Sequence, residues 1–492
     1  MLCKKRFGIE VTMNYSIIRR TTGLVLKFEA IFLLLPALTG FFYREREGLI
    51  YLALAAAYYA IGFLINLKGD AGTEFYTKEG FISVALVWLV ISICGALPFV
   101  LCGDIPNYSD ALFETISGFT TTGSSILADV EALSHASLFW RSFTHWVGGM
   151  GILVFVLALL PEAAGDSIYL MRAESPGPSV GKLVPKVKST AKILYLIYIA
   201  ITVLEIVALM LAGMSLYEAS VISFGSVGTG GFAIRNSGCM EYTALQQWVI
   251  TFFMIACGAN FNVYFLFVAR KFREAFKSEE VISYLSIYAV ITALVAFNIR
   301  NTFTGVHDVI RHSMFNVASV MTTTGFATAD FNTWPTFSKM LLLVAMFIGG
   351  CAGSTAGGVK VSRVIIGSKT IRKELQHFVH PRSVKILKFE GKPIEHAVLR
   401  GINVYFLTYI IIFAVSVILV ALDEKDFTTT VTAVIATFNN IGPGLEMVGP
   451  TGNFSQFSIF SKYVLMFDML AGRLELFPML LLFMPMTWRR QR

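Results

Sequence analysis

The segment FTTTGSS at Phe119–Ser125 is short and polar, contains one glycine, and has three counterparts further along the chain. They read GTGGFA at Gly228–Ala233, TTTGFA at Thr322–Ala327 and NNIGPG at Asn439–Gly444. One glycine in each segment can be aligned with the others, at spacings of 108, 94 and 117 residues: Gly123, Gly231, Gly325 and Gly442. With this register Phe113 falls on Phe315 and Ser117 on Ser319. A unit of about 100 residues is therefore repeated four times, and the architecture of the chain follows from this repeat.

A second glycine recurs in the apolar stretch that follows each segment. It lies 26, 27, 25 and 30 residues after the first one, at Gly149, Gly258, Gly350 and Gly472. Each unit thus holds an apolar stretch, a short polar segment and another apolar stretch. Because every unit crosses a membrane twice, successive units keep one orientation, and parallel repeats are related by an axis along the membrane normal. The sequence predicts four such units around one central pore.

The composition is that of a membrane protein with many crossings. Of its 492 residues, 55% are hydrophobic and 15% charged, and the mean hydropathy is +0.67. A helix crosses the hydrocarbon core with roughly 20 apolar residues. Ten stretches approach this length: 28–43, 49–67, 81–102, 138–161, 191–214, 246–268, 281–299, 338–366, 399–421 and 458–487. We therefore predict an all-α membrane protein with two N-terminal transmembrane helices before the four repeats.

The predicted units have limits at the loops between these stretches. We place an N-terminal pair of helices at 1–75, repeat 1 at 76–165, repeat 2 at 190–270, repeat 3 at 280–375 and repeat 4 at 395–492. The second helix of repeat 3 is expected to be broken, because it contains GGCAGSTAGG at Gly349–Gly358. Such a run of small residues cannot hold a helix that faces lipid, so it must face protein or water.

The positions of the basic residues indicate which loops face the cytosol. They gather in the loops after the second, fourth, sixth and eighth stretches, with Lys68, Lys182, Lys271 and Lys373 among them. The ends of the chain add Arg19, Arg489 and Arg490. By the positive-inside rule these regions face the cytosol, so we expect both termini there. The net charge of +8 is thus explained without a nucleic-acid partner, and lipid is the expected surrounding.

The four polar segments suit a desolvated cation. Non-helical backbone at membrane depth is tolerated where it is buried or lines a wet cavity, and its carbonyl groups can then replace the water around an ion. Glycine allows the backbone conformations that turn carbonyls inward, and threonine adds hydroxyl oxygens. The predicted ligands of K+ are Thr121, Thr122, Gly123, Thr229, Gly230, Gly231, Thr323, Thr324, Gly325, Asn440, Ile441 and Gly442. The fourth segment lacks threonine, so its oxygens there would come from the main chain.

With these four ordered signatures, the chain resembles the Trk/Ktr/HKT superfamily of potassium transporters over essentially its whole length. Within that superfamily it is similar to the bacterial TrkH type, which carries two extra N-terminal helices. The resemblance implies a pore with fourfold pseudosymmetry, in which the aligned glycines favour potassium over sodium. It also implies potassium uptake across the cytoplasmic (inner) membrane, a homodimer, and a cytosolic TrkA-type nucleotide-binding regulatory subunit.

The same resemblance implies a gate. In the family the stretch that corresponds to Gly349, Gly350, Gly353, Gly357 and Gly358 forms an intramembrane loop below the filter, and a lysine follows it at the position of Lys360. Close packing of small residues is the alternative for this stretch. Arg473 lies inside the last apolar stretch, where a charge is costly unless it faces a cavity or a partner. The family places an arginine there near the ion path; contact with Glu475 or a carbonyl is the alternative.

Two other functional classes remain for comparison. A secondary transporter for another solute also uses parallel repeats and broken helices, but it usually needs one or two broken pairs rather than four filter-like segments. A membrane enzyme should show paired carboxylates or a His/Glu cluster at membrane depth, and the sequence has none. The six cysteines and seven histidines have no metal-binding spacing. We therefore expect no enzymatic activity and no cofactor, with potassium as the transported ion.

Overall fold

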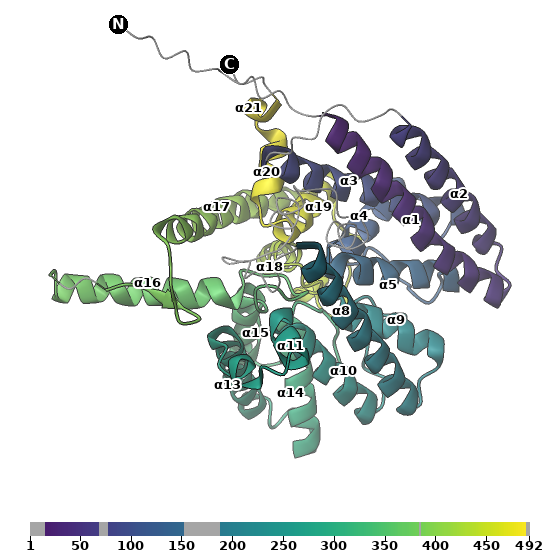
Figure 1. Ribbon diagram of the computed structural model, residues 1–492. Coiled ribbons are helices and arrows are strands. Elements are labelled where there is room, and N and C mark those ends of the chain that lie inside the picture. The colour runs from purple at the N-terminus through teal and green to yellow at the C-terminus, as the bar shows by residue number, and fades with distance from the viewer. Residues whose placement is uncertain (1–14, 68–76, 152–186, 383–384, 489–492) are drawn as a thin grey trace, which may run out of the picture.

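The computed structural model describes residues 15–67, 77–151, 187–382 and 385–488 (Figure 1). In this part of the chain the regular structure is helical, apart from a two-stranded antiparallel hairpin of β1 (Lys388–Phe389) and β2 (Lys392–Pro393). The predicted all-α class, with four helix–pore loop–helix repeats and an N-terminal helix pair, is confirmed. Predicted topological markers such as Lys182, Arg489 and Arg490 lie outside the described residues.

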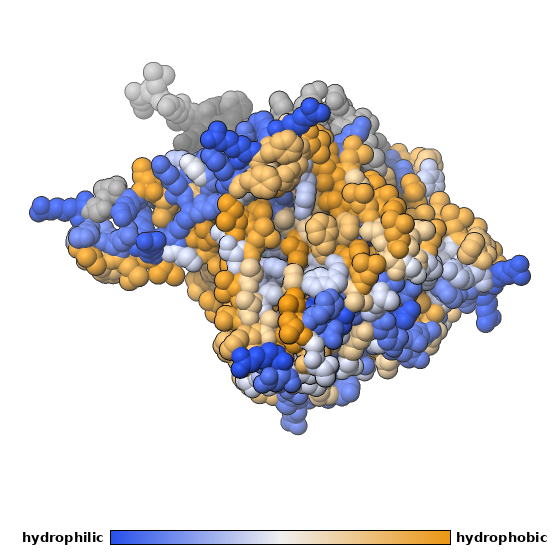
Figure 2. All heavy atoms as spheres, turned by 90° about the horizontal axis from the view of Figure 1, so that it is seen from below, coloured by the Kyte–Doolittle hydropathy of each residue, from blue (hydrophilic) through white to orange (hydrophobic). Residues whose placement is uncertain are grey.

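Six helices in the described part of the chain are long and apolar enough to cross a membrane unbroken. Two form the N-terminal pair, α1 (Tyr15–Tyr43) and α2 (Glu47–Asn66). The other four each open one repeat: α3 (Thr77–Cys102), α8 (Val187–Leu211), α13 (Glu279–Asn298) and α17 (His396–Val420). Figure 2 shows hydrophobic residues over much of one face of the molecule, with hydrophilic residues gathered towards its edges. A lipid-facing surface has this distribution.

The second helix is interrupted in more repeats than the sequence predicts. In repeat 2, α10 (Ala244–Cys257) and α11 (Phe261–Val268) meet at 92°. In repeat 3, α15 (Thr336–Ile348) and α16 (Val361–Val379) flank a twelve-residue break, 349–360. In repeat 4, α19 (Ile459–Arg473) is followed by α20 (Phe477–Phe483). In repeat 1, α5 (His135–Gly149) ends two residues before the end of the described range 77–151.

The predicted continuous stretches 246–268 and 458–487 are therefore wrong as single helices. The local reason in repeat 2 is that α10 ends at Gly258, and the Asn260 side chain accepts a hydrogen bond from the Asn262 N–H to begin α11. In repeat 4, Leu476 has a φ of 67°, and Pro478 begins the new helix. Both signals are single residues within long apolar runs, which hydropathy alone does not resolve.

Between the two apolar helices of each repeat lies a shorter pore helix. These are α4 (Tyr108–Phe119), α9 (Leu216–Val227), α14 (Val306–Met321) and α18 (Phe427–Phe438). Three of them begin where a side chain caps the first turn, from Asn107, Ser215 and Asp426. All four end four residues before the aligned glycine of their repeat. The pore helices therefore deliver the four polar segments to the centre of the molecule in one register (Figure 1).

Short elements complete the fold at its surfaces. They are α12 (Phe272–Ala275), α21 (Pro485–Trp488) and three 3-10 turns, η1 (Phe331–Thr333), η2 (Ala421–Asp423) and η3 (Glu446–Val448). Helix α16 projects away from the body in Figure 1. Several of its apolar side chains are exposed, among them Ile371, Leu375, Phe378 and Val379.

The N-terminal pair is held by glycines at helix crossings. A Cβ on Gly62 would lie 2.6 Å from the Gly23 carbonyl oxygen, and one on Gly40 would lie 2.8 Å from Gly48. Small residues of this kind let two helix backbones approach closely, and in lipid such packing replaces the hydrophobic effect between helices.

We predict that Gly62→Ala destabilises the protein by about 1–3 kcal/mol, because the added methyl must displace the α1 backbone. Gly401→Ala is the matched control, since Gly401 lies in α17 with no atom within 4 Å of a built Cβ. Thermal unfolding of both variants in the same detergent measures the difference. Equal melting temperatures would contradict the close crossing.

Candidate functional site

The four polar segments share one backbone conformation. Two residues before each aligned glycine the chain adopts a left-handed conformation, with φ of 54°, 53°, 55° and 56° at Thr121, Thr229, Thr323 and Asn440. The aligned glycines also have positive φ, of 81°, 83°, 88° and 99° at Gly123, Gly231, Gly325 and Gly442. The alignment made from the sequence is therefore matched residue for residue by the backbone.

Each left-handed residue ends its pore helix in a Schellman motif. The N–H that follows it bonds back to the carbonyl five residues earlier, as in Thr122 to Ser117 at 2.8 Å and Thr324 to Ser319 at 2.8 Å. The same bond joins Gly230 to Gly225 at 2.7 Å and Ile441 to Ala436 at 2.8 Å. Glycine is usual at the left-handed position, whereas three of these four residues are threonines. A left-handed β-branched residue costs about 1–3 kcal/mol and persists where surrounding contacts hold it, commonly at ligand sites.

The four segments contact one another in a closed ring. A Cβ built on Gly123 would collide with the carbonyl oxygen of Gly230, and one on Gly231 with that of Thr324. One on Gly325 would meet the carbonyl oxygen of Ile441, and one on Gly442 would lie 2.8 Å from that of Thr122. Each glycine thus lies against the residue that precedes the glycine of another repeat, in the order 1, 2, 3, 4 and back to 1. The predicted ligands are all brought together at this ring.

The side-chain oxygens of the predicted ligands divide into two sets. Thr122 and Thr324 lie within 2.7 and 2.8 Å of the hydroxyls of Thr120 and Thr322 in their own segments, and Thr122 Oγ1 also accepts from the Asn440 amide at 2.9 Å. The hydroxyl of Thr229 donates to the carbonyl of Gly228 at 2.7 Å. By contrast, Thr121 Oγ1 and Asn440 Oδ1 are buried and have no hydrogen-bond partner in the described part of the chain. The Asn440 side chain lies against Gly472 and donates to the Met469 carbonyl, both in α19, whereas the unpaired Thr121 oxygen is suited to a desolvated cation.

The break in repeat 3 forms a buried loop under this ring. Its glycines Gly349, Gly353 and Gly358 have φ of 73°, 68° and 76°, and Lys360 has φ of 80°. The predicted alternative for this stretch, close helix packing, does not describe it, because residues 349–360 form no helix. The predicted gate residues Gly349, Gly350, Gly357 and Lys360 are buried, while Gly353 and Gly358 are half-buried.

Main-chain N–H groups of the loop donate hydrogen bonds to the polar segment of its own repeat and to two other repeats. The Gly357 N–H donates to Thr323 Oγ1 at 2.6 Å, directly on a predicted K+ ligand. The Gly358 N–H donates to the Asn439 carbonyl at 3.1 Å, which connects the loop to repeat 4. The Cys351 N–H donates to the Gly258 carbonyl at 2.9 Å, which connects it to repeat 2. The loop is therefore held against the ring by repeats 2, 3 and 4.

Arg473 adds the connection to repeat 1. Its guanidinium donates to the carbonyl of Thr355 in the loop at 2.9 Å, and to those of Gly148 and Gly149 at 2.5 and 2.6 Å. Those two carbonyls are at the C-terminal end of α5, where a helix dipole favours a cation. Lys360 bonds within the loop, to the carbonyl of Ala356. Of the two contacts considered for Arg473, the carbonyl contact is present, whereas Glu475 forms an ion pair with Arg363.

The sequence interpretation missed several charged residues around the ring and the loop. Glu280 accepts hydrogen bonds from the Ala352 N–H at 2.6 Å and from Asn260 at 3.2 Å, which hold the loop. Arg363 lies over the Tyr405 ring at 4.0 Å. Behind the ring, Glu114 and Arg141 form a buried ion pair at 2.6 Å. The available signal was the position of each charge within or beside an apolar stretch, which marks such residues as paired or functional.

In repeat 4 the second recurring glycine has a different register from the one predicted. A Cβ on Gly148 would collide with the carbonyl oxygen of Phe119, and one on Gly472 with that of Phe438. Phe119 and Phe438 are the last residues of their pore helices, so Gly148 rather than Gly149 is the counterpart of Gly472. Arg473 therefore occupies the place that Gly149 has in repeat 1.

Comparison with known proteins gives consistent matches. The family model TrkH, described as a cation transport protein, matches residues 52–302 and 302–490. The Trk system potassium uptake protein TrkH of Escherichia coli K12 is 35% identical over 489 residues, covering 97% of this chain and all of the relative. TrkH of Halomonas elongata is 32% identical over 486 residues, with the same coverage.

A solved structure shows the same fold. The crystal structure of the potassium transporter TrkH from Vibrio parahaemolyticus superposes with a TM-score of 0.87 at 31% sequence identity. It covers 97% of this chain and 100% of its own. Together with the apolar helices, these matches identify a membrane protein with many crossings. The chain belongs to the TrkH family of cation transport proteins.

Proposed function

We propose that this protein takes up potassium through a selectivity filter made of its four polar segments, gated by the intramembrane loop 349–360. The observation that carries the proposal is the closed ring in which each aligned glycine contacts the preceding carbonyl of another repeat. Relatives that match the whole chain bear the name potassium uptake protein. The repeats that supply the ring have the limits proposed above from the sequence.

The ring offers what a desolvated potassium ion needs. Removing a monovalent ion from water to a low-dielectric interior costs on the order of 20 kcal/mol without replacement ligands. Carbonyl oxygens from four strands, with the free side-chain oxygen of Thr121, can replace that water. The proposed ligands are the twelve residues at 121–123, 229–231, 323–325 and 440–442. The pore helices point the negative ends of their dipoles towards the same region, which favours a cation.

The loop is the proposed gate because it is held against this ring. Its hydrogen bond from Gly357 to Thr323 occupies an oxygen that an ion could use. Arg473 and Lys360 hold the loop in place through carbonyl groups. The fixed positive charge of Arg473 also opposes a cation near the inner end. Opening then requires the loop to leave Thr323 and Asn439, and Arg473 to release Thr355.

The remaining assignments follow from the family. We propose that the protein lies in the bacterial cytoplasmic membrane, with both termini in the cytosol. We further propose that it forms a homodimer and binds a cytosolic TrkA-type nucleotide-binding subunit. The exposed apolar side chains of α16 support a protein contact beyond the body of the molecule. The protein acts on potassium as the transported ion, without a cofactor of its own and without enzymatic chemistry.

Gly231→Ser tests the filter. A serine at this position would be strained by the φ of 83° and would meet the carbonyl oxygen of Thr324, so the second strand must move. We expect a fall of about tenfold or more in the potassium-to-sodium permeability ratio, since about 1.4 kcal/mol of lost discrimination is tenfold. Reversal potentials of the purified protein in liposomes measure this ratio.

Gly103→Ser is the matched control for that variant. Gly103 has nearly the same φ, 84°, but no atom lies within 4 Å of a Cβ built on it. The control carries the same backbone strain far from the ring. If both variants kept the original permeability ratio, the filter assignment would be wrong.

Deleting residues 353–357 tests the gate. The deletion removes the Gly357 bond to Thr323 and the Thr355 carbonyl that Arg473 holds, so we expect a higher basal rubidium flux into liposomes. Combining the deletion with Gly231→Ser is the control. A flux that passes through the ring should then change its ion selectivity, whereas a leak through misfolded protein should not. An unaltered basal flux in the deletion variant would remove the gating role.

A further inference from the structure

Helix α5 of repeat 1 presents two polar side chains to the polar segment of repeat 2. Arg141 and His145 are one helical turn apart and therefore lie on the same face of α5. Arg141 Nη1 donates to the carbonyl of Ala233 at 2.8 Å. Its guanidinium carbon lies 3.5 Å from the centroid of the Phe232 ring. Both contacts are within two residues of Gly231.

His145 holds the same segment from the same helix. Its Nδ1 lies 2.7 Å from the carbonyl oxygen of Gly118, and its Nε2 accepts a hydrogen bond from the Phe232 N–H at 3.1 Å. These partners require a neutral ring with its proton on Nδ1. A Cβ on Gly230 would collide with the imidazole. This collision explains why repeat 2 has glycine where repeats 1 and 3 have threonine.

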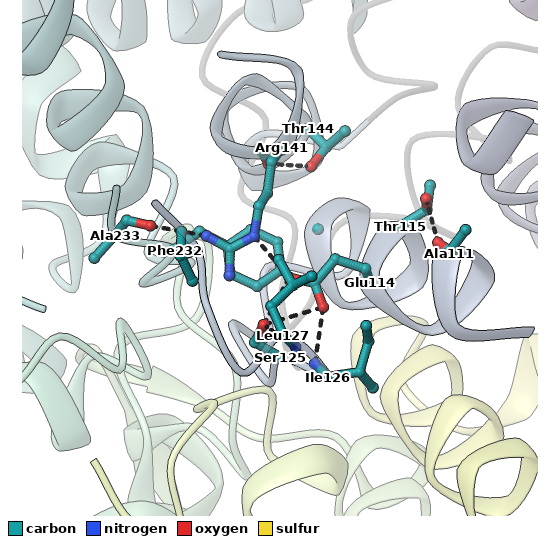
Figure 3. A network of polar contacts seen from close by, with 12 residues as sticks. Ala111, Glu114, Thr115, Ser125, Ile126, Leu127, Arg141, Thr144, Phe232 and Ala233 are labelled. Atoms are coloured by element: carbon teal, nitrogen blue, oxygen red, sulfur yellow. Dashed lines mark hydrogen bonds and ion pairs between the residues drawn. The ribbon is translucent and has the colours of Figure 1, made fainter. Parts of the chain in front are cut away.

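Glu114 connects this contact to the segment of repeat 1. It comes from pore helix α4 and is fully buried, and its Oε1 lies 2.6 Å from Arg141 Nε. Its carboxylate also accepts from the Ser125 hydroxyl at 2.9 Å and from the Ile126 N–H at 3.0 Å. Figure 3 shows the resulting chain of contacts from Ile126 through Glu114 and Arg141 to Ala233. A buried ion pair thus joins the outer ends of the first two segments.

The other repeats have no charge at the place of Glu114. In the common register this position is Ile222 in repeat 2, Asn316 in repeat 3 and Ala433 in repeat 4. Asn316 bonds to Thr328 of its own repeat at 3.1 Å. Among these four positions, a carboxylate that can form this ion pair therefore occurs in repeat 1 alone.

We propose that Glu114 and Arg141, with His145, are positioning residues that fix the spacing of the first two filter strands and thereby set the discrimination of potassium from sodium. The inference rests on the filter proposed above. A strand that is held from behind on both sides cannot close around the smaller sodium ion, so its carbonyls match the larger ion better. We call Glu114, Arg141 and His145 the bracket. Without these three side chains, the Ala233 carbonyl and the Phe232 N–H lose fixed hydrogen-bond partners, and the second strand can change its position.

The test uses variants that separate folding from positioning. Removing one member of a buried ion pair leaves an unpaired buried charge, whereas neutralising both members leaves no charge without a partner. The double variant Glu114→Gln/Arg141→Met should therefore fold better than either single variant. Arg141→Lys is the second variant, because lysine is a point charge without the forked donors that reach Glu114 and Ala233 together.

The matched control is Asp110→Asn/Lys462→Met. Like the pair of Glu114 and Arg141, this pair has a buried cation, Lys462, and a short distance between the charged atoms, 2.7 Å. It joins repeats 1 and 4 at the start of α4. In the described part of the chain the bond of Lys462 goes to Asp110 and neither residue belongs to the four polar segments, so the control removes an ion pair between repeats without altering the ring.

Reversal potentials in liposomes, with potassium and sodium gradients, give the readout. We expect the bracket double variant and Arg141→Lys to lower the potassium-to-sodium permeability ratio about fivefold, the effect of one lost hydrogen bond. The control should keep the original ratio. If Gly231→Ser changes the ratio while both bracket variants keep it, the positioning role is wrong and the filter stands. An equal fall in the control would also overturn the positioning role, and no change in any variant would overturn the filter as well.

Discussion

The contact between each aligned glycine and the carbonyl of another repeat determines where the pore helices and the helices around them can lie. Four strands approach so closely that no side chain fits at Gly123, Gly231, Gly325 or Gly442. The pore helices end at the same distance from these glycines, and each is closed by the same Schellman motif. The helices around them are placed to bring four identical helix ends to one axis. Strained threonines at the left-handed positions are tolerated because all four helix ends are packed against neighbours.

The sequence was sufficient to predict the ring and the repeats, because glycine at a fixed register is a strong local signal. It was less informative about the second helices, where the breaks after Gly258 and Arg473 depend on single residues inside apolar runs. The direction of the threonine hydroxyls also could not be predicted from the sequence. Thr122 and Thr324 turn towards their own segments, whereas Thr121 keeps a free oxygen, and only packing decides between these rotamers.

The repeats share a backbone but differ in how each segment is held from outside. Between repeats 1 and 2 the contacts come from Arg141, which is ion-paired to Glu114 of its own repeat, and from His145. Between repeats 4 and 1 the contacts are neutral bonds, from Ser124 to the Gly442 carbonyl at 3.0 Å and from the Asn440 amide to Thr122 at 2.9 Å. At these contacts a threonine of repeats 1 and 3 is replaced, by Gly230 in repeat 2 and by Asn440 in repeat 4. The fourfold pattern thus belongs to the main chain, and the side chains break it.

The proposed gate and the proposed filter form one hydrogen-bonded unit. Gly357 contacts a hydroxyl of the ring itself, and Gly358 contacts the C-terminal end of pore helix α18. Arg473 connects the same loop to the end of α5, and α5 also carries Arg141 and His145. A movement of the loop must therefore alter the partners of a ring oxygen and of the helix that supports the second strand. In the proposed mechanism, the loop below the ring and the support of the second strand are therefore linked through Arg473 and α5.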